Sequence, residues 1–244
     1  MNPIACVLSL ACAILSNELT IPGPIFAGDS MPRVFIIDAV ALRSVKLRTQ
    51  QNSGSLKPAL AKLTREADRA LISAPLSVMH KELAPPSGDR HDYVSLAPYW
   101  WPNPNTHNGL PYVRRDGEIN PERNSIADRQ NLENTVTLVK TLALAYYFTA
   151  NEDYAKQATT MLHVWFLDPS TRMNPHLKYA QGIPGRNAGR AAGIIESHKL
   201  PELVDAVGLL AGSATWTQAH QRQLQSWFTT FLTWLLESPE GRAE

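Results

Sequence analysis

Cysteine is nearly missing from this 244-residue chain, since Cys6 and Cys12 both lie close to its start. If that start is removed, a disulfide framework, a Cys-based metal site and a cysteine nucleophile are all excluded. An excess of one charge is missing too, because 23 Lys and Arg oppose 22 Asp and Glu, for a net charge of +1. Without a basic surface field, sequence-independent nucleic-acid binding is not expected.

A hydrophobic run long enough to cross a bilayer is also lacking. Residues 4–15, IACVLSLACAIL, form the apolar stretch near the start, but a membrane helix needs about 20 such residues. The stretch fits the apolar region of a secretory signal, although no Lys or Arg precedes it. We predict a signal over 1–28, a secreted protein (extracellular or periplasmic), and no membrane association after signal removal. The alternatives are a buried helix, or a true start at Met31.

Recognisable metal and phosphate motifs are absent from the sequence. It contains no His-Glu-x-x-His, and no Gly-Lys-Ser/Thr follows its glycines. Glu196 and His198 are two residues apart, so on a helix their side chains would diverge. We therefore expect no metal and no cofactor.

What the chain does contain is helical periodicity. Apolar residues recur at steps of three and four over 60–71, 132–146, 154–165, 187–198, 201–210 and 224–235. One stretch, Val34–Ile37, resembles a strand. Consecutive helices with short connections predict an all-α fold of antiparallel helix hairpins, as in a solenoid or toroid.

Residues 87–124 interrupt this pattern with a long loop rich in Pro, Asn and Gly. Loops of this length in compact domains are usually functional or disordered, and this one carries Tyr99, Trp100 and Trp101. Flat aromatic faces can stack on the C–H faces of sugar rings. The alternative is that the aromatic rings anchor the loop on the core.

Arginines are the second group of candidate binding residues. Arg114 and Arg115 could grip a carboxylate through bidentate hydrogen bonds. Alternatively, they belong to a surface hairpin, turning at Asp116–Gly117, in which they pair with Asp116, Glu118 or Glu122.

Polar residues on two predicted helices complete the candidates. The glycines 185, 189 and 193 would form a smooth face on the helix 187–198, beside which Arg190 and His198 could line a cleft. Asn134, close to Asn131 at the start of another helix, could point at a ligand, or could cap the helix or face water.

Three motifs carry a resemblance to a known family. YWWPNP (99–104), GLPYVRRDGEINPE (109–122) and QGIPGRNAGRAAGIIE (181–196) resemble, in this order, the alginate lyase domain family of polysaccharide lyases. The resemblance implies an (α/α) toroid over 33–244. It also implies export, and metal-independent β-elimination on an acidic polysaccharide such as alginate or polyglucuronate.

One feature departs from the family. Its members continue past SPEGRAE into an Asn-Asn-His segment whose Asn and His take part in catalysis, whereas this sequence stops at Glu244. We therefore expect only the N-terminal part of the toroid and assign no catalytic residue. The substrate-binding candidates are Tyr99, Trp100, Trp101, Arg114, Arg115, Asn134, Arg190 and His198.

The sequence leaves the chemical roles open. A catalytic acid could come from Tyr99, Tyr112 or Tyr179, and a carboxylate partner from Arg114, Arg115 or Arg190. A glycoside hydrolase on the same toroid would instead need two carboxylates across a cleft. These could come from Asp89, Asp92, Asp116, Glu118 and Glu196. A non-catalytic remnant that binds acidic polysaccharide is the third possibility.

The missing Asn-His segment predicts that the 244 residues alone are an inactive fragment. Incubation of the purified chain with a polyuronate should yield little of the unsaturated, ultraviolet-absorbing product that a lyase releases. Product formation at the level of a longer relative would contradict this expectation.

Overall fold

The computed structural model describes residues 31–51 and 54–243. The predicted secretory signal, with both cysteines, lies outside the described residues. Within them the structure is all-α, as predicted, and its longer helices follow one another in pairs. These are α2 (Ala39–Gln50) with α3 (Lys57–Leu71), α4 (Asp128–Thr149) with α5 (Glu152–Leu162), and α6 (Leu200–Leu209) with α7 (Gln218–Glu237).

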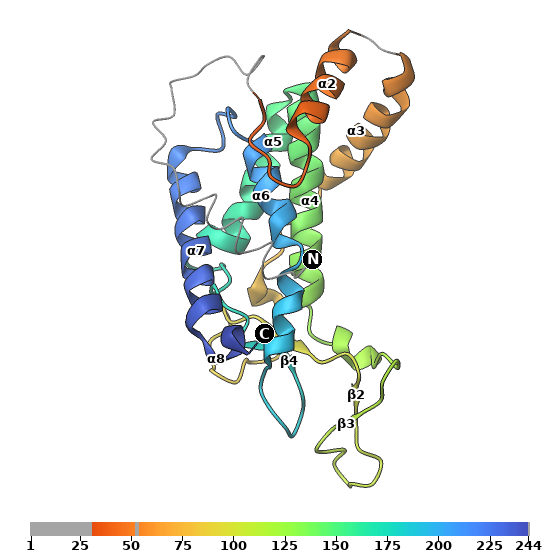
Figure 1. Ribbon diagram of the computed structural model, residues 1–244, viewed down its shortest axis with the longest axis vertical. Helices are drawn as coiled ribbons and strands as arrows, with labels where there is room; N and C mark the ends of the chain where they lie inside the picture. Colours follow the sequence, from red (N-terminus) through yellow and green to blue (C-terminus); the bar gives the residue numbers. More distant parts are fainter. Residues whose placement is uncertain (1–30, 52–53, 244) are drawn as a thin grey trace.

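Successive helices run in alternating directions, so each pair is an antiparallel hairpin (Figure 1). Five of the helices were predicted from apolar spacing. The sixth, α2, escaped because it buries only Leu42 and therefore has no apolar stripe; instead, the Asp38 carboxylate caps its first turn by accepting the N–H groups of Val40 and Ala41. Arrays of this kind make up (α/α) toroids.

Helix α4 is the centre of the array and packs against α3, α5 and α6. Its buried side chains form one broad face, on which Leu132, Val136, Val139, Leu142 and Ala143 are all at most 2% exposed. Burying so much apolar surface in one helix stabilises the array at about 25 cal/mol per Å² removed from water. The helix is consequently the fixed element to which neighbouring segments attach.

The connections between hairpins are the longest irregular segments, and they gather at one end of the helices (Figure 1). They include the short helices η2 (Val78–His80), η3 (Pro121–Asn124) and η5 (Ala191–Ser197), and the π-helical η4 (His163–Leu167), which extends α5. The remaining short helices are η1 (Gly54–Leu56) and α8 (Pro239–Arg242).

Four short strands form at this same end. Strand β1 (Val94–Leu96) pairs in parallel with β4 (Tyr179–Gly182), and β2 (Trp100–Trp101) pairs antiparallel with β3 (Val113–Arg114). None was predicted, because strands of two to four residues are too short to show alternating polarity. They join the loop 87–124 to itself and to the third sequence motif.

Two predicted elements are wrong. Val34–Ile37 is no strand: the N–H groups of Phe35 and Ile37 donate to the buried carboxylate of Asp205, at 2.6 and 2.8 Å, and not to a neighbouring strand. Pairing with a carboxylate on α6 satisfies these amides without a ladder.

The predicted helix 187–198 is limited to the 3₁₀ turns of η5, and Arg190 before it is extended (φ −153°, ψ 159°). The glycines therefore form no helical stripe. Gly189 is required for another reason, since a Cβ there would overlap the carbonyl oxygen of Lys178.

No helix among the described residues is both long and apolar enough to span a bilayer.

A buried ion pair connects the helices to the loops. Lys81 Nζ lies 2.8 Å from Asp128 Oδ2 and 2.7 Å from the Val78 carbonyl oxygen, and both charged side chains are at most 1% exposed. The same Asp128 oxygen accepts the N–H of Val94 at 2.9 Å. Burial lowers the pKa of Lys81 and raises that of Asp128, while their mutual attraction opposes both shifts.

We predict that Lys81→Met lowers the free energy of unfolding by about 3–5 kcal/mol, because it leaves Asp128 buried without its counter-charge. The double variant Lys81→Met/Asp128→Asn should recover part of this loss, since Asn removes the charge and can still accept the Val94 N–H. Denaturant unfolding measures both values. A double variant no more stable than Lys81→Met would contradict this account.

Candidate functional site

The first two sequence motifs form one structure, the β2–β3 hairpin. Trp100 pairs with Arg114 and Trp101 with Val113, and the N–H of Arg115 donates to the Tyr99 carbonyl oxygen at 2.9 Å. The buried Asn120 stabilises the hairpin through two hydrogen bonds. Its side-chain amide donates to the Trp100 carbonyl oxygen at 2.8 Å, and its backbone N–H donates to Pro98 at 2.7 Å. The aromatic loop is therefore held in a defined conformation.

The aromatic side chains of β2 and of the preceding Tyr99 are neither buried in the core nor fully exposed. Trp100 and Trp101 are half-buried, and Tyr99 is 37% exposed. A guanidinium lies over each indole: Arg115 is 5.2 Å from the ring centroid of Trp101, and Arg186 is 5.0 Å from that of Trp100. Such cation–π pairs orient the arginine as well as the ring.

The third motif completes this surface. The N–H of Tyr112 donates to the Pro184 carbonyl oxygen at 3.0 Å, and Arg186 Nε donates to the Tyr112 carbonyl oxygen at 2.8 Å. Gly185 has φ +75°, and a Cβ there would come within 2.8 Å of Pro111 Cα, so glycine is needed for the approach. We call residues 99–101, 112–113, 115 and 184–186 the aromatic wall.

The predicted carboxylate-binding arginines of the hairpin already have acidic partners. Arg114 Nε lies 2.6 Å from Asp116 Oδ1, and Arg115 Nη1 lies 3.8 Å from Glu118 Oε2. The structure thus corresponds to the surface-hairpin alternative, with the turn at Asp116–Gly117. Exposed pairs of this kind add little stability, about 0–1 kcal/mol each.

Arg190 is connected to the interior through a chain of hydrogen bonds. Its Nη2 donates to Gln181 Oε1 at 2.6 Å, and the Gln181 N–H donates to Ser95 Oγ at 2.8 Å. Ser95 in turn donates to Glu196 Oε2 at 2.5 Å, which also accepts the hydroxyl of Tyr93 at 2.8 Å. Gln181 has φ 51°, the left-handed conformation that costs a non-glycine residue about 1 kcal/mol or more.

Glu196 is buried at the end of this chain. Burial raises the pKa of its carboxyl group, against the opposing hydrogen bonds from Ser95 and Tyr93. Burial and the neighbouring Glu196 together raise the pKa of Tyr93 well above its ordinary value. The second carboxyl oxygen, Oε1, accepts no hydrogen bond among the described residues. The sequence predicts a helical position for Glu196 and carries no signal of its role in joining β1, β4 and η5.

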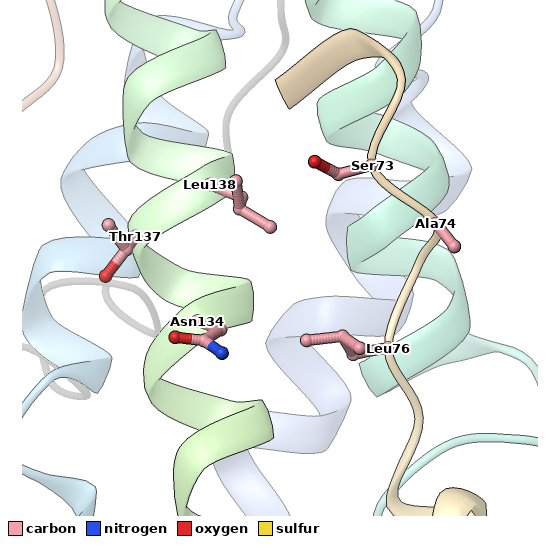
Figure 2. A pocket seen from close by; sticks show the side chains of 6 residues that line it. All are labelled: Ser73, Ala74, Leu76, Asn134, Thr137 and Leu138. Atoms are coloured by element: carbon pink, nitrogen blue, oxygen red, sulfur yellow. The ribbon is translucent and has the colours of Figure 1, made fainter. Parts of the chain in front are cut away.

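Asn134 and His198 have other surroundings. Asn134 lines a hollow of about 320 Å³ together with Thr137 and Leu138 of α4, facing residues 73–76 (Figure 2). Its side-chain oxygen accepts from Gln130 at 2.9 Å. His198 is exposed, and its ring Nδ1 lies 3.1 Å from the carbonyl oxygen of Ile195.

The tyrosines proposed as acids differ in their environment. Tyr112 donates its hydroxyl to Glu122 Oε2 at 2.6 Å, and partial burial together with this carboxylate raises its pKa to about 12. It therefore stays protonated at neutral pH. Tyr179 on β4 is half-buried beside the ring of His176, and Tyr99 is exposed on the wall.

The carboxylates that a hydrolase would need are already engaged. Asp116 and Glu118 pair with arginines, and Glu196 is buried. Asp92 contacts His176 at 3.0 Å and accepts from Ser87 and Asn174, while Asp89 also accepts from Asn174. Across residues 31–51 and 54–243, no three His, Cys, Asp or Glu side chains are placed to hold a metal ion together.

Comparisons with known proteins agree with the motifs in this site. The model of the alginate lyase family matches residues 77–244. The crystal structure of an alginate lyase from Bacteroides ovatus is similar to this chain, with 43% sequence identity, a TM-score of 0.82, and coverage of 86% of this chain. No curated protein gave a match.

The chain belongs to the alginate lyase family. It spans 55% of the length of the Bacteroides ovatus enzyme. All three motifs lie within the matched residues, which include the aromatic wall and the chain of hydrogen bonds ending at Glu196.

The buried Glu196 generates a prediction about pH. Because its pKa is raised in the folded protein, the folded state binds the proton more tightly, and stability falls as the pH rises above the ordinary value of 4.5. Glu196→Gln keeps an oxygen for Ser95 and Tyr93 and removes this loss. The variant should gain stability over the natural chain as the pH rises, as measured by thermal unfolding.

A matched control is available in Glu202. The charge and hydrogen bond of Lys140, at 2.9 Å, outweigh partial burial and lower its pKa. Glu202→Gln should therefore change with pH in the opposite direction: relative to the natural chain it should lose stability as the pH rises toward 4.5, and the difference should then stay constant at higher pH. Equal pH profiles for the two variants would refute the account of Glu196.

Proposed function

We propose that this protein is a secreted polysaccharide lyase that cleaves uronic-acid polymers, such as alginate or polyglucuronate, by β-elimination. Family membership and the similarity to an alginate lyase support the reaction class. The apolar stretch 4–15 supports secretion. The aromatic wall is the part of the described structure that we assign to binding of the sugar chain.

The observation that carries this assignment is the combination of aromatic rings and cations on one exposed surface. Trp100 and Trp101 offer half-exposed indoles, and arginine guanidiniums lie within about 5 Å of both ring centroids. Indole faces and edges suit the C–H groups of a sugar ring, whereas guanidinium groups suit a carboxylate. A uronic acid carries both features on one ring, and a neutral sugar has only the first.

β-Elimination on a uronate requires three groups. A base removes the proton from the carbon that bears the carboxylate, and an acid protonates the departing glycosidic oxygen. The carbon–oxygen bond breaks as a carbon–carbon double bond forms, so no water is consumed. Hydrogen-bond donors must stabilise the charge that develops on the carboxylate side. The exposed guanidinium groups of the wall are suited to hold that carboxylate.

A hydrolase on the same fold finds less support. Its two carboxylates must be free to protonate the glycosidic oxygen and to activate water or attack the sugar. Asp92, Asp116 and Glu118 are held by charged or polar partners, and Glu196 is enclosed by Tyr93 and Ser95. The structure thus favours elimination over hydrolysis.

The test compares a polyuronate with the same polymer after chemical reduction of its carboxyl groups. We expect the protein to bind the polyuronate more tightly than the reduced polymer, and the small amount of product that it releases should absorb in the ultraviolet. Binding is measured by calorimetry, and ultraviolet absorbance and new reducing ends are followed in parallel.

Each other outcome contradicts a part of the proposal. New reducing ends without ultraviolet absorbance would identify a hydrolase. Polyuronate binding without either signal would contradict catalysis by these 244 residues and would leave only the binding of acidic polysaccharide. Equal affinity for the reduced polymer would show that the carboxylate is not recognised and would contradict a uronate as the ligand.

A further inference from the structure

We propose that Arg186, and not Arg114 or Arg115, is the residue of the aromatic wall that binds a uronate carboxylate, with Trp100 as its platform. This inference rests on the proposed function. Arg186 lies within the third motif between Gly185 and Asn187 and is not among the arginines predicted from the sequence to bind a carboxylate.

The three arginines of the wall region differ in their partners. Arg114 and Arg115 face Asp116 and Glu118, which neutralise them locally. Among the described residues, no carboxylate lies within ion-pair distance of Arg186, which is exposed. A cation without a local counter-charge attracts an anionic ligand more strongly than a cation that must first give up a partner.

The guanidinium of Arg186 is also held in one orientation. Its Nε donates to the Tyr112 carbonyl oxygen at 2.8 Å, and its central carbon lies 5.0 Å from the Trp100 ring centroid. Only Nε is used in hydrogen bonding to the described residues, so Nη1 and Nη2 remain for a ligand. Two parallel N–H groups match the two oxygens of a carboxylate.

The backbone that carries Arg186 is closed into a tight turn. The N–H groups of Arg186 and Asn187 both donate to the Ile183 carbonyl oxygen, at 2.9 and 3.1 Å, and Gly185 supplies the left-handed residue (φ +75°). Contact between Gly185 and Pro111 fixes the turn against the hairpin. A side chain ordered before binding loses less entropy when the ligand arrives.

An anion bound by Arg186 lies beside the indole of Trp100, which provides apolar surface for the rest of a sugar ring. The ligand class that uses both contacts is an acidic sugar, and a uronate is the one required by the proposed function. A sulfate ester on a neutral polysaccharide would present a similar anion, so the experiment includes it.

The experiment measures binding of a uronate oligosaccharide to the natural protein, Arg186→Gln, Arg186→Lys and the matched control Arg114→Gln. We expect Arg186→Gln to weaken affinity about tenfold or more, which corresponds to about 1.4 kcal/mol. Arg186→Lys should recover only part of this affinity, because an ammonium lacks the planar fork. Arg114→Gln should stay within about twofold, since its charge is already paired.

Two further ligands identify what Arg186 recognises. The carboxyl-reduced oligosaccharide should bind equally to the natural protein and to Arg186→Gln. A sulfated neutral oligosaccharide should bind more weakly than the uronate, and tighter binding of it would overturn the assignment to a uronate. Thermal unfolding of each variant checks that the turn and the hairpin are retained.

The two proposals fail in different ways. If the natural protein does not prefer the uronate over its reduced form, the proposed function fails. If it does, but Arg186→Gln binds the uronate as tightly as the natural protein, only the assignment to Arg186 is overturned. An equal loss for the uronate and the reduced oligosaccharide would likewise overturn it, because the carboxylate would not be the group recognised.

Discussion

The buried pair of Lys81 and Asp128 is the interaction on which the arrangement of this end of the molecule depends. It brings together the Val78 carbonyl, the first turn of α4 and the N–H of Val94 on β1. Two charges removed from water are costly unless each is fully paired. Because of this cost, α4 and β1 are held in one register, since any other register would leave a buried charge without its partner.

A second set of buried polar contacts connects β1 to β4, the strand that precedes wall residues 184–186. Ser95 links the buried Glu196 to the Gln181 backbone, and the Gln181 side chain accepts a hydrogen bond from Arg190. Gln181 adopts the left-handed conformation, whose strain is tolerated because partners on several elements hold the residue. These hydrogen bonds restrict how β1, β4 and η5 can be placed relative to one another. Helix packing and loop conformation are thereby coupled through polar contacts.

The wall itself shows how local charge decides which residue is available to a ligand. Its region carries several arginines, yet neighbouring carboxylates on the same hairpin occupy Arg114 and Arg115. Arg186 comes from a different segment, so no acidic residue adjacent in sequence accompanies it. Stacking on Trp100 and the hydrogen bond to Tyr112 hold it in place without neutralising it. The groups that hold Arg186 in position therefore leave the charge of its guanidinium available to a ligand.

Most of the helical fold could be predicted from the sequence, because the apolar spacing of α3 to α7 records which face each helix buries. The motifs also sufficed to identify the family. The failures include α2, which has one buried residue, and the strand predicted over Val34–Ile37. They also include the glycine-rich segment before η5, whose spacing is typical of a helix although Gly189 is needed for close packing against Lys178.

What the sequence determined by itself was therefore the class of fold and the residue types of the wall. Only the tertiary structure decided which arginine lacks an acidic partner, where Glu196 is buried, and that three motifs form one surface. The physical reason is separation along the chain. Helical periodicity is a local property, whereas Arg186 meets Tyr112 across 74 residues and Tyr93 meets Glu196 across 103. Contacts over such distances leave no periodic signal in a single sequence.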